Sequence, residues 1–219
     1  MFTAAGTPPP SAELSKYFNG PIESSPFTVC PKCNALKPFR CHHCSICNKC
    51  VLRMDHHCVW MCNDIGVGNV RFFVCFLVSF AISLLLAFVV TAPLNLKLSL
   101  SIKLLMTLEA VLGVGIGIFS FFHVIFVLTN QTSLEVADNI RDYFLRPKNE
   151  RKFITPYDLG IAKNVKQILR FNKWWELFNP FAKQVDINQL DVIISRKFME
   201  YTDFLDDEEE DENNGIVNH

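Results

Sequence analysis

The residues that could do chemistry gather in one short segment of this chain. Seven of its nine cysteines and four of its six histidines lie between residues 30 and 58. Thiolates and imidazoles are the preferred ligands of zinc, whereas a disulfide framework in a secreted protein has no need of histidine. The composition therefore predicts a reduced, metal-binding segment that faces the cytosol.

The segment repeats with a period of fourteen residues and offers two interleaved ligand sets. Each set begins with a Cys-x2-Cys knuckle, and both have the same spacing of two, nine and six intervening residues. The sets are Cys30, Cys33, His43 and Cys50, followed by Cys44, Cys47, His57 and Asp64. The first has the composition of a Cys3His zinc site, so we expect two structural zinc ions and folding that depends on them.

The second ligand set departs from the first at its last position. Asp64 stands where the repeat requires a cysteine. A carboxylate can bind zinc, but thiolates hold it better in structural sites. Cys62, two residues away, is the alternative fourth ligand. We therefore expect the second zinc to be bound more weakly or through a different ligand.

Cys58 is a cysteine that neither set uses. It lies fourteen residues after Cys44, where a third repeat would begin, but its knuckle partner would be Met61, a poor zinc ligand. His56 could take the thiol proton, and Asp55 could fix the tautomer of that histidine. Cys58 is thus a candidate nucleophile; the alternative is a spare metal ligand.

Two apolar runs follow the Cys/His segment, and the elements that they form determine where this segment lies. The first extends from Phe72 to about Pro93 without a charge, and the second, from Met106 to Leu128, is interrupted only by Glu109 and His123. Each run is long enough to cross a bilayer core of roughly 30 Å. Buried helices of a soluble core are the alternative. The net charge of −1 gives no indication of nucleic-acid binding.

The distribution of basic residues predicts the orientation of these spans. Only Lys97 and Lys103 lie in the link between them, whereas several cations follow the second span. These cations are Arg141, Arg146, Lys148, Arg151 and Lys152. The positive-inside rule then places both termini in the cytosol. Farther on, residues 190–205 have helical apolar spacing, which fits a helix packed on its own domain or one lying on the membrane.

Four motifs, in the same order, resemble the DHHC family of protein S-acyltransferases. They are Lys37-Pro38-x-Arg40 with His42-His43-Cys44, Asp55-His56-His57-Cys58 followed by Trp60, Gly66, Asn69 and Phe73, Thr132-Ser133-Leu134-Glu135, and Pro156-Tyr157-Asp158-Leu159-Gly160 with Asn164. The resemblance covers roughly residues 30 to 170.

The resemblance implies a two-step acyl transfer. Cys58 would take a palmitoyl or similar acyl group from acyl-CoA and pass it to a juxtamembrane cysteine of a substrate protein. His56 would be the base and Asp55 its orienting residue, while zinc would be structural only. Three basic residues could contact the CoA phosphates or could simply be solvated. They are Lys37, Arg40 and Arg53.

Family members usually have two further membrane helices before the Cys/His domain, and this sequence has none there. On that basis we expect slow reaction with acyl-CoA unless another copy or another membrane protein completes the wall around the acyl chain. The family suggests the ER or Golgi membrane. A non-catalytic, membrane-anchored zinc module that binds partners or substrates is the alternative function.

The expected fold is a mainly α membrane protein with a zinc-stapled, Cys-rich cytosolic domain of short hairpins, two transmembrane helices and a small helical C-terminal region. The expected boundaries are a loose arm at 1–27, the zinc domain at 28–70, membrane helices at 71–93 and 106–128 around a lumenal link at 94–105, a cytosolic region at 129–205 and an acidic, disordered tail at 206–219.

Overall fold

The computed structural model describes residues 4–8, 27–93, 99–170 and 176. The predicted helix at 190–205 and the acidic tail at 206–219 lie outside the described residues.

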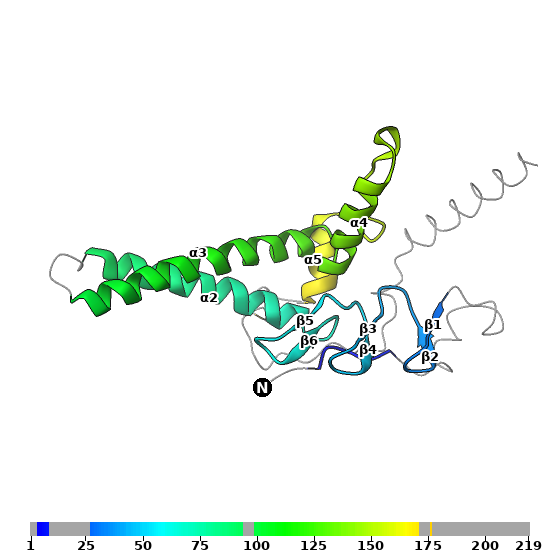
Figure 1. Ribbon diagram of the computed structural model, residues 1–219, viewed down its shortest axis with the longest axis horizontal. Coiled ribbons are helices and arrows are strands. Elements are labelled where there is room, and N and C mark those ends of the chain that lie inside the picture. Colours follow the sequence, from blue (N-terminus) through cyan, green and yellow to red (C-terminus); the bar gives the residue numbers. More distant parts are fainter. Residues whose placement is uncertain (1–3, 9–26, 94–98, 171–175, 177–219) are drawn as a thin grey trace, which may run out of the picture.

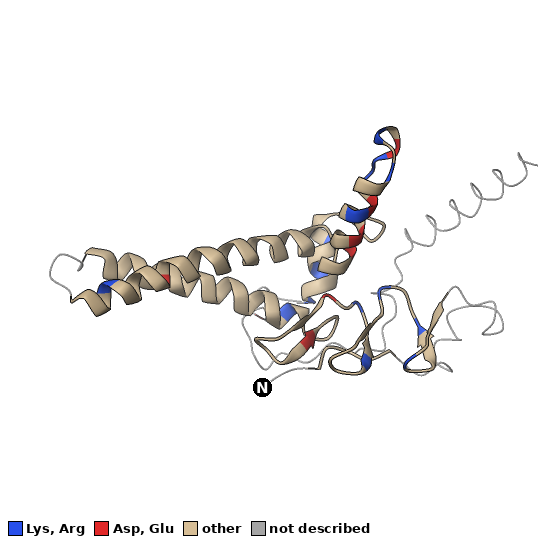
Figure 2. Cartoon of the chain, in the orientation of Figure 1, with Lys and Arg blue, Asp and Glu red and all other residues tan. Residues whose placement is uncertain are grey.

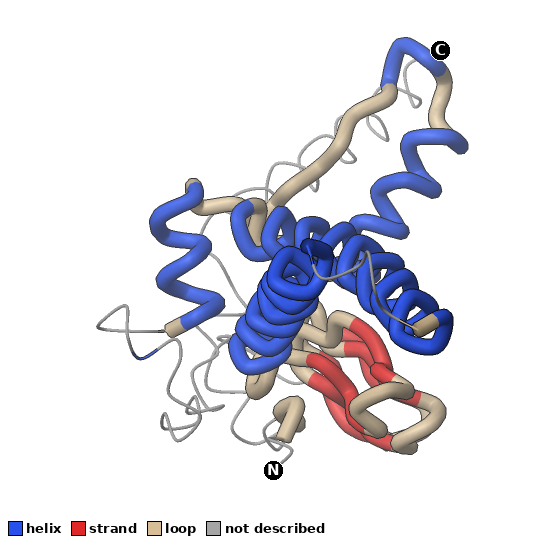
Figure 3. Tube along the Cα trace, turned by 90° about the vertical axis from the view of Figure 1, so that its left-hand side faces the viewer, coloured by secondary structure: helices blue, strands red, loops and turns tan. Residues whose placement is uncertain are grey.

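Three short antiparallel hairpins form the Cys/His domain, and they repeat with the period seen in the sequence (Figures 1 and 3). Their strands are β1 (Thr28–Cys30), β2 (Ala35–Lys37), β3 (His42–Cys44), β4 (Lys49–Val51), β5 (His56–Cys58) and β6 (Asn63–Ile65). Equivalent turn residues, Asn34, Asn48 and Cys62, all have positive φ angles between 46° and 50°. The predicted short hairpins are therefore present, one for each fourteen-residue unit.

Two long helices, α2 (Val70–Thr91) and α3 (Leu100–Leu128), extend from the hairpins as an antiparallel pair (Figure 1). Both are long and apolar enough to cross a membrane, and only 22% of the most apolar window in each is buried. Side chains of a soluble core would be covered, so this uncovered apolar surface fits a lipid environment. Charged residues are few along the pair, and most of the coloured segments in Figure 2 lie in the hairpins and in the helices that follow α3.

The second helix begins earlier than the apolar pattern indicated. It starts at Leu100, within the expected link 94–105, because the residues before Met106 continue the helix and the backbone N–H of Lys103 donates to the carbonyl of Ser99. At 1.5 Å per residue, its 29 residues span about 43 Å. This length exceeds a bilayer core of about 30 Å, so the first turns can reach the headgroup region.

Two shorter helices, α4 (Ser133–Leu145) and α5 (Ile161–Leu169), follow, with the 3-10 turn η4 (Lys148–Glu150) between them. A capping box starts α4: the Thr132 hydroxyl accepts from the Glu135 N–H, and the Glu135 carboxylate accepts from the Thr132 N–H. This pairing satisfies two N–H groups that a helix start leaves open.

One apolar cluster joins the third hairpin to the helices. Phe73 and Leu77 of α2, Val127 of α3 and Ile168 of α5 are buried together with Cys58 of β5. Residues from three helices therefore share one buried cluster with the thiol predicted to be the nucleophile.

Residues 4–8 are not the loose arm that the sequence suggested. Ala5 is 1% exposed, its carbonyl accepts from the N–H of Gly68, and the carbonyl of Gly6 accepts from the N–H of Leu52. Small residues allow this close backbone approach, which an apolar-periodicity argument does not detect. The described part of the arm is thus packed against the Cys/His domain.

Gly66 is expected to tolerate no side chain. An added Cβ would lie 2.8 Å from the carbonyl oxygens of both Ala5 and Leu52 and 2.7 Å from Val51 Cγ1. We expect Gly66→Ala to cost about 1–3 kcal/mol of unfolding free energy, because backbone cannot move aside cheaply. Thermal unfolding of the detergent-solubilised protein checks this.

Gly115→Ala in α3 is the matched control, since a Cβ there meets no described atom within 4 Å. It should leave the midpoint unchanged or raise it. Equal midpoints for the two variants would contradict the packing argument.

Candidate active site and metal centres

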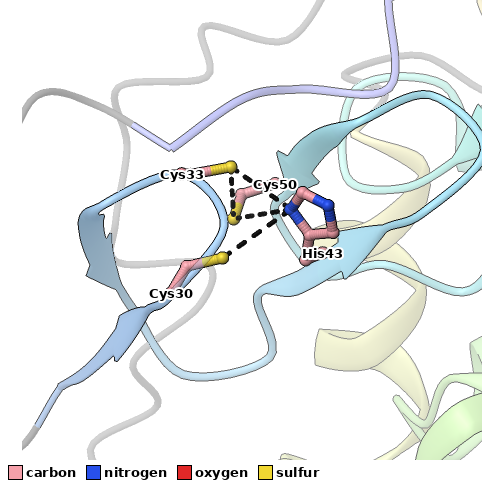
Figure 4. Close-up of side chains that lie close together, drawn as sticks. All are labelled: Cys30, Cys33, His43 and Cys50. Atoms are coloured by element: carbon pink, nitrogen blue, oxygen red, sulfur yellow. Dashed lines mark hydrogen bonds between the residues drawn. The ribbon is translucent and has the colours of Figure 1, made fainter.

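The first ligand set forms a compact cluster between the first two hairpins (Figure 4). His43 Nδ1 lies 3.7 Å from Cys30 Sγ, 3.2 Å from Cys33 Sγ and 3.9 Å from Cys50 Sγ. The Cys33 and Cys50 sulfurs are 3.6 Å apart. A zinc tetrahedron with bonds of about 2.0–2.3 Å has edges of about 3.5–3.8 Å. The donor set and its spacing therefore fit a zinc ion.

The second cluster contains the predicted carboxylate. His57 Nδ1 lies 3.7 Å from Cys44 Sγ, 3.5 Å from Cys47 Sγ and 2.8 Å from Asp64 Oδ1. Asp64 is fully buried, and its Oδ2 has no hydrogen-bond partner, which is costly for a carboxylate unless a cation is nearby. Cys62 is exposed and directs its sulfur to the Val59 carbonyl. The structure thus brings Asp64, and not Cys62, into this cluster.

Cys58 lies on the third hairpin, outside both clusters. It is buried, whereas β5 leaves His56 half-buried. Side chains two residues apart on a strand point to the same face, so His56 and Cys58 share one face while His57 points to the metal cluster. The imidazole nitrogen His56 Nδ1 lies 2.6 Å from Asp55 Oδ2. This pairing leaves Nε2 of His56 available on the face that carries the thiol.

The Asp55 carboxylate is held from several elements at once. The Oδ1 atom accepts from the backbone N–H of Ser133 at 2.8 Å. The backbone carbonyl of Asp55 accepts from the Ser133 hydroxyl at 2.7 Å. Burial alone would raise the pKa of Asp55, but contacts with His123, with His56 and with the Ser133 N–H hold that pKa well below its usual range. Asp55 is therefore an ionised carboxylate held beside the first residue of α4.

His123 is a site residue that the sequence reasoning did not assign. It comes from the apolar helix α3, is 5% exposed, and places Nε2 3.5 Å from Asp55 Oδ2. The available signal was its presence in a membrane-length apolar run, where an ionisable residue is expensive and commonly functional. Its partner could not be foreseen, because 68 positions separate it from Asp55.

Arg40, one of the residues expected to contact CoA phosphates, is buried in a hydrogen-bond network within the chain. Its guanidinium is buried and donates to the Glu135 carboxylate at 2.6 and 2.9 Å, and to the Asn130 side chain and carbonyl at 3.1 and 2.8 Å. The Tyr157 ring covers it at 3.9 Å. Arg40 thus joins the Cys/His domain to the end of α3 and the start of α4.

Arg53 and Lys37, the other two residues expected to contact CoA phosphates, differ in their burial. Arg53 is 2% exposed and donates to Asn130 and to the Gln131 carbonyl, each at 3.3 Å, and burial lowers the pKa of its guanidinium. Lys37 ends β2 and is half-buried, in the hairpin farthest from β5 in Figure 1. The three predicted cations therefore do not form one patch, and Lys37 alone keeps a partly open ammonium.

The C-terminal motif, residues 156–164, packs at the junction between the end of α3 and the start of α4. Asn164 of α5 is fully buried; its amide donates to the Leu128 carbonyl at 2.6 Å and to Asp158 at 2.7 Å, and it accepts from the Leu159 N–H at 2.9 Å. Asn164 thus fixes α5 and its preceding loop against the open carbonyls at the end of α3.

Residues 23–140 match the family described as "DHHC palmitoyltransferase". The chain is 31% identical over 189 residues to "Probable protein S-acyltransferase 14" of Arabidopsis thaliana, covering 80% of this chain and 57% of that protein. It is 36% identical over 169 residues to "Palmitoyltransferase PFA3" of Debaryomyces hansenii, covering 72% and 41%. Against "Palmitoyltransferase ZDHHC2" of Mus musculus it is 31% identical over 176 residues, covering 74% and 46%. The chain spans about half the length of these curated relatives.

Metal content should distinguish the two ligand clusters. We expect between one and two zinc ions per molecule, because Asp64 replaces a thiolate in the second cluster only. Asp64→Cys should raise the occupancy toward two, and Asp64→Ala should lower it toward one, as measured by elemental analysis of purified protein.

Cys62→Ser is the control, because Cys62 lies outside the cluster, and it should leave the zinc content unchanged. Loss of metal on Cys62→Ser would show that Cys62 is the fourth ligand, and absence of zinc from the unchanged protein would end the metal assignment.

The buried ion pair between Arg40 and Glu135 should be important for stability. Arg40→Met leaves the Glu135 carboxylate without its cation, and breaking a buried pair costs about 3–5 kcal/mol. Arg141→Met removes a partner of Asp138 on exposed α4 and should cost at most about 1 kcal/mol. Comparable unfolding midpoints for the two variants in detergent would refute the assigned role of Arg40.

Proposed function

Because this chain belongs to the DHHC palmitoyltransferase family, we propose that it is a protein S-acyltransferase that carries a long-chain acyl group on Cys58. The observation that best supports the proposal is the third hairpin. It pairs antiparallel like the first two hairpins and supplies His57 and Asp64 to the second ligand cluster, yet Cys58 lies outside both clusters and the Asp55–His56 pair lies directly before it. A spare metal ligand would need neither feature.

In the first step of the proposed reaction, His56 Nε2 takes the proton of the Cys58 thiol. The thiolate attacks the carbonyl carbon of the acyl-CoA thioester, the bond from that carbon to the CoA sulfur breaks, and the CoA thiolate leaves with the proton from His56. Asp55 accepts from His56 Nδ1 and so holds the tautomer that exposes the Nε2 lone pair.

In the second step, a thiol of the substrate protein gives its proton to His56 and attacks the acyl-Cys58 thioester. The Cys58 thiolate leaves and recovers a proton from His56, so the chain returns to its starting state. Each step exchanges one thioester for another, so little free energy is needed to drive the transfer. His56 serves as the base in both steps.

The two metal clusters have a structural role in this proposal. When bound, one zinc would join the first hairpin to the second and the other would join the second to the third, and neither would supply chemistry to the acyl group. The ligand residues hold β3 and β4 next to β5. They thereby fix the position from which His56 and Cys58 act.

The helix pair offers the surface for the acyl chain. Cys58 belongs to one buried apolar cluster with Phe73 and Leu77 of α2 and Val127 of α3, so an acyl group on its sulfur would start near the apolar junction of the two helices. Each buried methylene contributes about 0.8 kcal/mol. Palmitoyl-CoA or a similar acyl-CoA is therefore the proposed donor, and Lys37 remains the proposed basic contact for CoA.

The proposed location is a membrane, with the hairpins and the helices α4 and α5 on the cytosolic side. The uncovered apolar helices support insertion, and the basic residues after α3 support this orientation. The ER or Golgi is the proposed compartment by family likeness. The proposed partners are membrane lipid, substrate proteins with a cysteine close to the membrane, and another copy of the chain or an accessory membrane protein.

Labelling with palmitoyl-CoA tests the nucleophile. The detergent-solubilised chain should become labelled on Cys58 through a bond that hydroxylamine cleaves, and Cys58→Ser should abolish the label while leaving the zinc content unchanged. The exposed thiol of Cys62 provides the matched control, and Cys62→Ser should retain the label.

Loss of a zinc equivalent on Cys58→Ser would make Cys58 a ligand and remove the basis of the proposal. A folded, zinc-loaded chain that takes no label would instead favour a non-catalytic module that binds partners or substrates.

A further inference from the structure

Two histidines, and not one, approach the Asp55 carboxylate. His56 Nδ1 lies 2.6 Å from Asp55 Oδ2, and His123 Nε2 lies 3.5 Å from the same oxygen. The two imidazole rings face each other edge to face, with centroids 5.8 Å apart. His56 comes from the metal-organised domain and His123 from the membrane-length helix α3, so Asp55 lies where these parts meet.

The ring of His123 is held in a narrow range of orientations. Its Nδ1 lies 3.0 Å from the Phe119 carbonyl, one helical turn earlier. Three aromatic rings surround it, with centroids 5.2, 4.3 and 5.4 Å away. These rings belong to Phe73, Phe119 and Phe126. A ring fixed in this way directs Nε2 toward Asp55.

His123 lies between two oxygen acceptors, which restricts the hydrogen bonds that its ring can donate. The Phe119 carbonyl lies at one nitrogen and the Asp55 carboxylate at the other, and neither oxygen can donate. A neutral imidazole satisfies one of them with its single N–H, whereas an imidazolium satisfies both. Nε2 of His123 is buried and makes no hydrogen bond among the described residues, and Asp55 Oδ2 lies 3.5 Å from it. Catalytic hydrogen bonds are often long without substrate and shorten in the reacting complex, so this contact can close.

We propose that His123 is a second positioning residue of the acyl-transfer site, which holds the Asp55 carboxylate from within the membrane-spanning helix and so fixes the orientation of His56. The inference rests on the proposed acyltransferase function. Ser133 holds Asp55 Oδ1, and His123 would restrain Oδ2, the atom that faces His56. Without this second contact the carboxylate could rotate about its side-chain bond and release Nδ1 of His56.

Two variants separate positioning from packing. His123→Leu keeps an apolar side chain in the ring cage but removes the donor, and His123→Gln restores an amide N–H near the position of Nε2. Thr107→Val is the matched control, because it removes a side-chain donor from an exposed position of the same helix, where the hydroxyl donates only to Lys103 of its own helix. Zinc content is measured for each purified full chain as the check of folding.

The first measurement is the rate of Cys58 acylation over a range of palmitoyl-CoA concentrations. Loss of a partner that orients a site residue typically costs about 10–100-fold in activity, and we expect this loss for His123→Leu. The half-saturating concentration should change by less than about twofold, since an interaction made in the transition state is lost and not one made in binding. His123→Gln should recover most of the rate.

The second measurement needs no acyl-CoA. Iodoacetamide alkylation of Cys58, quantified by mass spectrometry of the peptide, reports how well His56 activates the thiol, and it should slow for His123→Leu and recover for His123→Gln. If unchanged protein is alkylated rapidly but takes no acyl group, the acyltransferase proposal fails while the comparison of variants still tests His123.

Equal rates for His123→Leu and Thr107→Val in both measurements would overturn the inference. So would a His123→Gln variant that retains zinc but is as slow as His123→Leu, because only ring packing would then matter. If His123→Leu loses zinc, His123→Gln alone decides between these outcomes.

Discussion

The carboxylate of Asp55 is the point on which the arrangement of this molecule depends. It is almost entirely buried, and a buried anion is tolerated only when donors surround it. Donors reach it from β5 through His56 and from the start of α4 through Ser133, and His123 of α3 lies 3.5 Å from the same carboxylate. Satisfying one charge therefore requires three parts of the fold to be in place together. The same requirement orients the imidazole next to Cys58, so stability and chemistry have a common origin here.

A second buried charge supports the first. The guanidinium of Arg40 is bonded to Glu135 and Asn130 and lies under the Tyr157 ring. Glu135 also caps the helix whose first N–H group reaches Asp55. The motifs that look separate in the sequence are thus one network that attaches the hairpin domain to the ends of the long helices. Removal of the Arg40 guanidinium, for example, leaves the Glu135 carboxylate without its compensating charge.

The sequence predicted the repeated parts of this structure well, because local spacing determines them. The fourteen-residue period predicted both ligand clusters, and the apolar runs predicted α2 and most of α3. Short hairpins were expected as well, although the third unit, which lacks a complete ligand set, was not expected to repeat the form of the other two. The missed features all depend on distant partners. The motif that contains Arg40 does not show that Glu135, 95 positions later, will cover its charge. His123 could be noted as unusual but not matched to Asp55, and the packing of Ala5 leaves no periodic pattern.

The burial of Asn130 has a consequence for how the chain matures. Asn130, Gln131 and Thr132 form an acceptor sequence for N-linked glycans. In the folded chain Asn130 and Thr132 are each 1% exposed, and the Asn130 amide donates to the Tyr157 carbonyl and to Gln167. An oligosaccharide could be attached only before this junction forms, and once attached it would prevent the junction from forming. A chain inserted with this segment exposed to the glycosylation machinery would therefore be marked and kept unfolded by the same modification.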